Sequence, residues 1–149
     1  MVAAIRPDSW NFPLFLHVFG AMVLVGGVLM CAATIAAARG DSRLLRLGYF
    51  SLLAVGLPGY VLMRLGAQWI YAKEGLDDAR IDTTWATIGF VVSDGGAVLL
   101  LISLITGGIG IRRLHIGGGK RLLTASMLIS IVLLAAFTVT VWAMGAKPT

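Results

Sequence analysis

Apolar residues gather in four long stretches separated by short polar segments. The stretches run over about residues 13–38, 47–71, 84–111 and 122–144. A helix needs about 20 consecutive apolar residues to cross a bilayer, and each stretch supplies at least that many. The pattern therefore predicts an all-α, polytopic membrane protein. We expect one domain over residues 1–149, folded as an antiparallel bundle of four transmembrane helices.

Proline and capping residues mark details of this pattern. Pro13 falls in the first turn of the first span, where proline is tolerated. Pro58 lies inside the second span and removes a backbone hydrogen bond there, which predicts a kink. Asp82 or Thr83 is the predicted N-cap of the third span.

Composition supports the membrane assignment, and we therefore expect the lipid bilayer to be the main partner of the chain. The chain has a mean hydropathy of +0.92, with 58% hydrophobic and 13% charged residues. Soluble domains carry about a quarter charged residues, so this chain lacks the polar surface of a soluble fold. Its net charge of +5 is compatible with nucleic-acid binding, but the basic residues cluster in two short loops between apolar stretches. We therefore expect no nucleic-acid partner.

Charge asymmetry between the loops predicts the orientation. One side carries seven basic residues and one acid, Asp41; the basic residues are Arg39, Arg43, Arg46, Arg112, Arg113, Lys120 and Arg121. The other side carries four basic and five acidic residues. By the positive-inside rule, loops 39–46 and 112–121 are cytoplasmic and both termini lie outside. The predicted location is a bacterial inner membrane.

Aromatic residues are consistent with this orientation. They fall near the predicted outer ends of the helices: Trp10, Trp69, Tyr71, Trp85 and Trp142. Tryptophan and tyrosine are enriched at membrane–water interfaces, where one end of the ring system is apolar and the other is wet.

Two residues inside the spans carry a formal charge, Arg64 and Asp94. Each costs roughly 2.5–3.5 kcal/mol to place at the centre of a membrane helix. Arg64 lies about 10 Å, and Asp94 about 15 Å, from the predicted outer ends of their helices at 1.5 Å per residue. Because those helices are antiparallel neighbours, we predict an Arg64–Asp94 ion pair, direct or through water.

Polar residues on the same helix faces extend this pair. Gln68 lies four residues after Arg64, and Thr87 lies seven before Asp94. Three roles remain open for the charged pair. It can fix helix register, it can take part in proton movement or anion binding, or a neutral Asp94 can face a partner subunit.

His17 is the main candidate for cofactor chemistry. It lies roughly 9 Å inside the first span, at a depth similar to Arg64 and Asp94, and we group these residues with Gln68 as an intramembrane polar cluster. An imidazole there can bind haem iron, relay protons, or simply bond a neighbouring helix. His115 lies in the opposite loop, and Cys31 is the single cysteine, so no metal site and no intrachain disulfide is predicted.

The first span reads FLHVFGAMVLVGG from Phe15 to Gly27. This resembles the opening helix of a loose group of bacterial four-helix membrane modules. The group comprises the copper-resistance protein D domain, the HemJ-type protoporphyrinogen oxidases and an uncharacterised family of integral membrane proteins. A Leu-His pair followed about nine residues later by glycine matches His17 and Gly26, and Pro58-Gly59 is similar to the uncharacterised family. The resemblance implies haem b as a cofactor, bound by His17.

The favoured function is that of an accessory or structural membrane subunit without an assigned reaction, and the chain is expected not to be an enzyme. Such a subunit belongs to a homo-oligomer or a larger membrane complex. One alternative is a b-type haem-binding or redox module that uses His17. A second is a proton-coupled small transporter module that works as an oligomer and uses Asp94 and Arg64.

Overall fold

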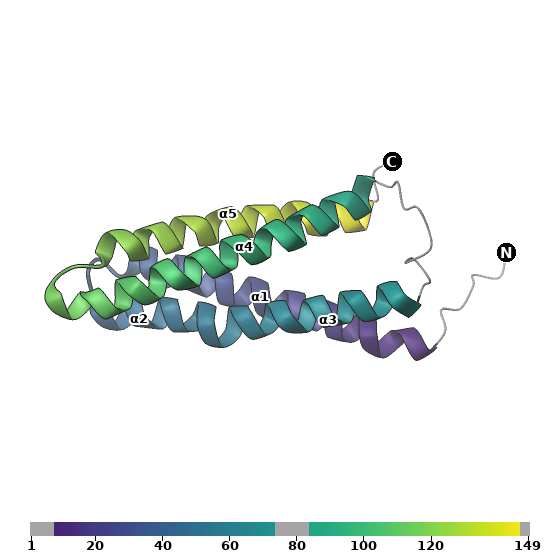
Figure 1. Cartoon of the computed structure of the whole chain (residues 1–149), viewed down its shortest axis with the longest axis horizontal. Coiled ribbons are helices and arrows are strands. Elements are labelled where there is room, and N and C mark those ends of the chain that lie inside the picture. Colours follow the sequence, from purple (N-terminus) through teal and green to yellow (C-terminus); the bar gives the residue numbers. More distant parts are fainter. Residues whose placement is uncertain (1–7, 74–83, 147–149) are drawn as a thin grey trace.

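The structure, a computed structural model, describes residues 8–73 and 84–146. Within these ranges the chain is helical apart from short turns and contains no strand, so the predicted all-α class is confirmed. In chain order the elements are η1 (Asp8–Trp10), α1 (Asn11–Ala37), α2 (Ser42–Ser51), η2 (Leu52–Gly56), α3 (Leu57–Lys73), α4 (Thr84–Arg113), η3 (Leu114–Ile116) and α5 (Lys120–Ala146). Figure 1 shows them as long, roughly antiparallel rods.

The described residues form four continuous helical segments long and apolar enough to cross a membrane. They run over Asp8–Ala37, Ser42–Lys73, Thr84–Ile116 and Lys120–Ala146. The protein is thus a multi-pass membrane protein. We call the end of the helical bundle that holds the turns 38–41 and 117–119 the basic end. The opposite end, where α1 begins and α5 ends, is the terminal end (Figure 1).

The second helical segment begins earlier than its apolar stretch. It starts at Ser42, because the side chain of Asp41 caps it by accepting a hydrogen bond of 2.8 Å from the Arg43 backbone N–H. The polar turn containing Arg43 and Arg46 is therefore helical, although it precedes the apolar span predicted from residue 47. The N-cap predicted at Asp82 or Thr83 lies outside the described residues.

The disruption predicted at Pro58 takes the form of a π-helical segment, η2, directly before it. The Leu57 backbone N–H donates to the carbonyl of Leu52, five residues earlier. Proline has no N–H, and its ring clashes with the carbonyl four residues earlier in a regular α-helix. Widening the preceding turn is one way to accommodate that clash.

The helices pack as two pairs, α1 with α3 and α4 with α5. Helix α1 also packs against α5, whereas the backbones of α3 and α4 make little contact. In Figure 1 the two pairs lie together near the basic end and diverge toward the terminal end. The space between α3 and α4 is consequently bridged mainly by side chains.

Glycines allow α1 and α3 to approach very closely. A Cβ added to Gly27 would lie 2.7 Å from the Cα of Gly56, and one added to Gly59 would lie 2.8 Å from the Cα of Leu24. Gly20 and Gly66 face the partner backbone in the same way. We call this close contact between α1 and α3 the glycine seam. Small residues at such positions let membrane helices gain van der Waals contact along its whole length.

A buried hydroxyl network ties the two pairs together in the half nearer the basic end. Ser103 of α4 and Ser126 of α5 share a 2.7 Å hydrogen bond, and Ser130 donates to Cys31 of α1 at 3.5 Å. All four side chains are fully buried. Each polar group therefore has a partner, as buried polar groups require.

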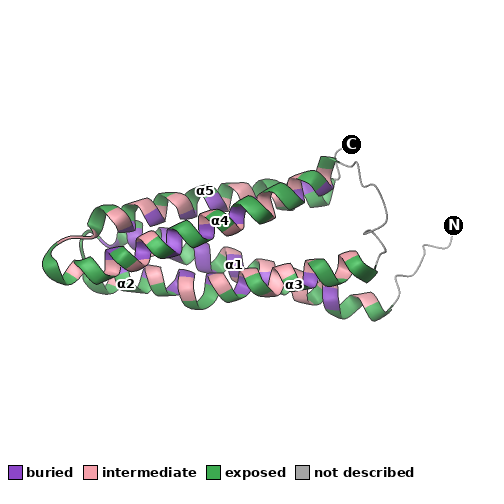
Figure 2. Ribbon diagram, viewed as in Figure 1, coloured by how far each residue is buried: buried purple, intermediate pink, exposed green. Residues whose placement is uncertain are grey.

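The outward faces of the helices are apolar. Large hydrophobic side chains are exposed on every long helix, including Met22 (68%), Val91 (65%) and Val141 (67%). Figure 2 shows buried residues on the inner faces and exposed ones around the outside. In water this would be an aggregating surface, whereas in a bilayer these faces are solvated by lipid.

Candidate functional site

The predicted contact between Arg64 of α3 and Asp94 of α4 is present. Arg64 Nη2 lies 2.8 Å from Asp94 Oδ1. The second guanidinium nitrogen, Nη1, donates to Ser93 Oγ at 2.9 Å. Arginine thus uses two arms of its planar fork on two consecutive residues of the neighbouring helix, which fixes the guanidinium in one orientation.

Tyrosines extend this contact toward both ends of α3. Tyr60 Oη donates to the backbone carbonyl of Ser93 at 3.2 Å, one turn nearer the basic end. Tyr71 lies edge-on to Phe90 with ring centroids 5.6 Å apart, nearer the terminal end. We call Tyr60, Arg64, Ser93 and Asp94 the polar bridge, since they join α3 and α4 where the helix backbones stay apart.

The polar bridge is only partly covered by the chain itself. The side chain of Arg64 is 29% exposed, but that of Asp94 is 64% exposed. Asp94 lies ten residues after the start of α4, about 15 Å along the helix axis. An ionised carboxylate facing hydrocarbon at this depth is costly, so it needs water or a protein partner on its open side.

His17 makes a separate contact between α1 and α3. Its Nδ1 lies 2.9 Å from the backbone carbonyl oxygen of Met63. A carbonyl oxygen only accepts hydrogen bonds, so Nδ1 carries the proton that is donated. In the neutral ring, Nε2 then holds a free lone pair, and it has no hydrogen-bond partner among the described residues.

The predicted cluster is therefore divided between two faces of α3. Met63 and Arg64 are consecutive residues, which point about 100° apart on a helix. Met63 faces α1, and its backbone carbonyl accepts the hydrogen bond from His17, while Arg64 faces α4. His17 is therefore not hydrogen-bonded to Arg64 or Asp94. Gln68 is exposed and makes no hydrogen bond within the described part of the chain.

His17 would suit a ligand of haem iron, because the Met63 carbonyl holds Nδ1–H and orients the neutral ring with Nε2 available for the metal. The second described histidine, His115, is exposed in η3 at the basic end, whereas His17 lies near the start of α1 at the terminal end. Among the described residues no group of three or more His, Cys, Asp or Glu side chains is arranged to hold a metal ion. Bis-histidine ligation would thus need a second copy of the chain.

Two members of the polar bridge were not predicted. Ser93 and Tyr60 carry no charge, so their sequence context did not single them out, although the position of each relative to Arg64 or Asp94 was informative. Ser93 directly precedes Asp94, and Tyr60 lies four residues before Arg64 on the same helix face. The sequence predicted that the polar group extends outward through Gln68. In the structure, the next contact between α3 and α4 toward the terminal end is instead made by Tyr71, which packs against Phe90.

Comparison with known proteins adds no assignment. No protein-family model matches the chain, and neither a curated protein nor a solved structure matches it significantly. The resemblance to four-helix membrane modules accordingly stays a prediction, and the polar bridge and His17 are the features that bear on function.

Proposed function

We propose that this protein is an accessory subunit of a membrane assembly and docks through the open side of the polar bridge. The observation that carries the proposal is the 64% exposure of the Asp94 side chain, well inside a membrane-spanning helix. A neighbouring protein surface that supplies hydrogen-bond donors would cover this carboxylate. The partner is a second copy of the chain or another membrane subunit.

The surroundings of Asp94 favour a protein partner over lipid. Val91 and Val98 flank it at one-turn spacing on the same helix face and are 65% and 57% exposed. Gly95 is also exposed, and nothing lies within 4 Å of the position where its Cβ would be. A polar group bordered by small and β-branched residues is typical of helix–helix contacts in membranes.

We further propose an orientation in a bacterial inner membrane, with loops 39–46 and 112–121 in the cytoplasm and both termini outside. The excess of basic residues at the basic end supports it. Single cysteines at exposed Ser9 and His115 test it with a membrane-impermeant maleimide. Ser9→Cys should react in intact spheroplasts and His115→Cys only after lysis, and the reverse pattern would invert the orientation.

Site-specific photocrosslinking tests the docking face. A photoreactive benzoylphenylalanine at Val98 should form a protein adduct in native membranes, because a subunit covers that face. The same residue at Met22 or Leu128, exposed on other helices, should react with lipid only. The adduct at Val98 should weaken in the Asp94→Leu background.

Equal yields of protein adduct at all three positions would contradict a defined docking face. A monomer by native mass spectrometry with no adduct at Val98 would contradict the accessory role. If Asp94 were then open to water, the transporter alternative would gain support, since proton movement needs a hydrated carboxylate.

A second candidate function is a b-type haem-binding module. The tautomer of His17 favours it, since the Met63 carbonyl holds Nδ1–H and leaves Nε2 free to bind iron. Haem bound there would supply one-electron redox chemistry. The chain itself would contribute the imidazole and its orientation.

An absorption spectrum of the purified protein, oxidised and then dithionite-reduced, tests the haem candidate. We expect a Soret band that shifts on reduction and disappears in His17→Ala. His115→Ala serves as the matched control and should leave the band unchanged. A flat spectrum from cells supplied with ample haem would remove this candidate.

A further inference from the structure

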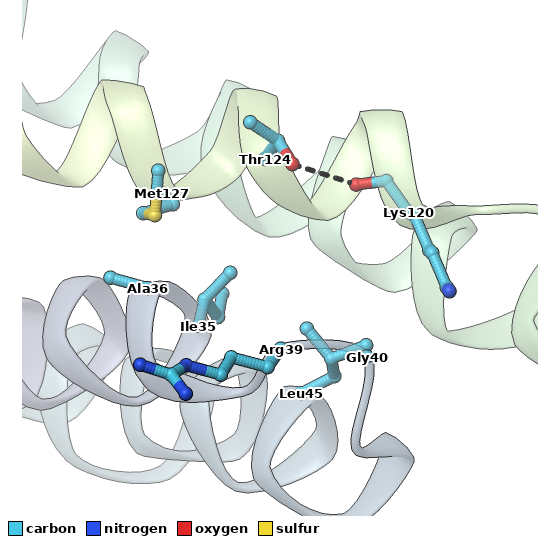
Figure 3. Close-up of a pocket in the computed structure, with 8 residues that line it drawn as sticks. All are labelled: Ile35, Ala36, Arg39, Gly40, Leu45, Lys120, Thr124 and Met127. Carbon is cyan, nitrogen blue, oxygen red and sulfur yellow. Dashed lines mark hydrogen bonds between the residues drawn. The ribbon is translucent and has the colours of Figure 1, made fainter.

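A pocket lies at the basic end, between the end of α1 and the start of α5. Its volume is about 270 Å³. Arg39, Gly40 and Lys120 form its polar part, and Ile35 and Met127 form part of its apolar wall. In Figure 3 the Lys120 side chain reaches from α5 toward the Arg39–Gly40 turn, whereas the Arg39 guanidinium extends along α1 below Ala36. Thr124 donates to the backbone carbonyl of Lys120.

The two cations of this pocket have no counter-ion within the part of the chain that the structure describes. Neither Arg39 nor Lys120 forms an ion pair with another described residue. The nearby acid in the sequence, Asp41, directs its Oδ1 to the Arg43 backbone N–H as the cap of α2. The Nζ of Lys120 lies 3.4 Å from where a Cβ on Gly40 would be, so the ammonium reaches across to the α1–α2 turn.

The backbone at Arg39 is held in an unusual conformation. Its φ is 43°, in the left-handed region that a residue other than glycine rarely adopts, and Gly40 follows at 97°. The turn is closed by a hydrogen bond of 2.6 Å from the Asp41 N–H to the Ala38 carbonyl. Such strain persists where surrounding structure holds it, and here it sets an arginine on the pocket.

A second pocket adjoins the first and adds to its positive field. It has a volume of about 470 Å³ and is lined by Arg113, the Gly117–Gly119 turn, Lys120 and Arg121. Lys120 is common to both pockets. Among the described residues, no acidic side chain lines either of them.

The position of the first pocket along the helices identifies the kind of anion. Ile35 lies within the apolar part of α1 and Met127 within that of α5, while Arg39 and Lys120 lie where those helices leave the apolar zone. A phospholipid has this same order, with acyl chains on one side and an anionic phosphate at the interface. Basic pockets between membrane helices suit such headgroups.

We propose that this pocket binds the headgroup of an anionic phospholipid. Its phosphate lies beside the Lys120 ammonium at the Arg39–Gly40 turn, and the Arg39 side chain turns away from α1 to reach it. The adjoining acyl chains lie against Ile35 and Met127. The site is independent of the polar bridge, which is in the other half of the molecule.

Native mass spectrometry of the delipidated full-length protein tests the site by titration with phosphatidylglycerol. The variant Arg39→Asn/Lys120→Gln removes both charges, and asparagine tolerates the positive φ at position 39. The control Arg43→Gln/Arg46→Gln removes two exposed charges from the same end of the molecule, outside the pocket. With about fivefold per basic residue, the pocket variant should bind at least tenfold more weakly and the control less than threefold.

Three results would overturn the proposal. Equal losses in both variants would mean general attraction to a basic surface. Equal binding of phosphatidylcholine would mean that the anionic charge is not recognised, and competition by inorganic phosphate at similar concentrations would mean a site for the free ion. Lys120→Gln alone keeps the test valid if the double variant does not fold, and it should lose binding by about fivefold.

Discussion

Arg64 shows how one residue can serve two needs in a membrane helix. Its charge has to be compensated, and its length lets it cross the space that α3 and α4 leave between them. Contacts of 2.8 Å to Asp94 and 2.9 Å to Ser93 satisfy two of its donors. The Arg64–Asp94 pair therefore joins two helices that glycine packing does not bring together.

Removing one charge should cost more than removing both. In Asp94→Asn, Arg64 keeps its charge but loses its counter-ion, whereas Arg64→Ala/Asp94→Ala leaves no isolated charge. Because Asp94 is largely exposed, we expect a modest difference, about 1 kcal/mol in detergent. Thermal unfolding followed by circular dichroism measures it, and equal melting temperatures for the single and double variants would contradict this account.

The π-helical segment η2 lies directly at the close contact between α1 and α3, the glycine seam. Pro58 disturbs the helix, and the widened turn at Leu52–Gly56 brings Gly56 against Gly27 of α1. Ser51, at the start of that turn, donates to the Gly48 carbonyl at 2.8 Å and also reaches the Gly27 carbonyl at 3.3 Å. The local irregularity is thus supported by packing on α1.

Adjacent glycines in α1 offer a matched test of this seam. Gly27→Ala would place a methyl group 2.7 Å from the Gly56 Cα, so we expect destabilisation of about 2 kcal/mol or more. Gly26→Ala meets nothing within 4 Å and should be neutral or stabilising by up to about 1 kcal/mol through helix propensity. Unfolding in a detergent–SDS titration compares the two, and equal effects would show that the seam is not close-packed.

The whole molecule is fastened differently at its two ends. Near the basic end the pairs α1–α3 and α4–α5 are joined by fully buried side chains, including Ser130 of α5 and Cys31 of α1. Near the terminal end they diverge, and α3 meets α4 through the polar bridge and the Tyr71–Phe90 contact (Figure 1). Local opening is therefore expected to start at the terminal end.

Hydrogen exchange should reveal this difference. In Asp94→Asn the amides of α4 between residues 84 and 96 should exchange several-fold faster, because one link between the pairs is lost. The amides between residues 100 and 110, next to the serine network, should keep their protection. Uniform acceleration along α4 would indicate that the molecule opens as a single unit.

Much of the architecture was predictable because each helix satisfies its own backbone in lipid. Apolar length therefore predicts the spans with little tertiary information. The Arg64–Asp94 pairing was predictable for a related reason, since few charges are tolerated at that depth and they seek each other. Tyr60 and Ser93 were missed because uncharged polar residues occur widely in membrane helices and give no comparable energetic signal.

The sequence by itself determined the all-α class, the four spans and the similar depth of Arg64 and Asp94 in the membrane. These features follow from the free-energy cost of polar groups in hydrocarbon. Only the tertiary structure decided the pairing of α1 with α3, the divergence of the two pairs and the separation of His17 from the polar bridge. Those features depend on which face each helix presents. The rotation of a helix is set by close packing at positions such as Gly27 and Gly59, and apolar composition alone leaves it undetermined.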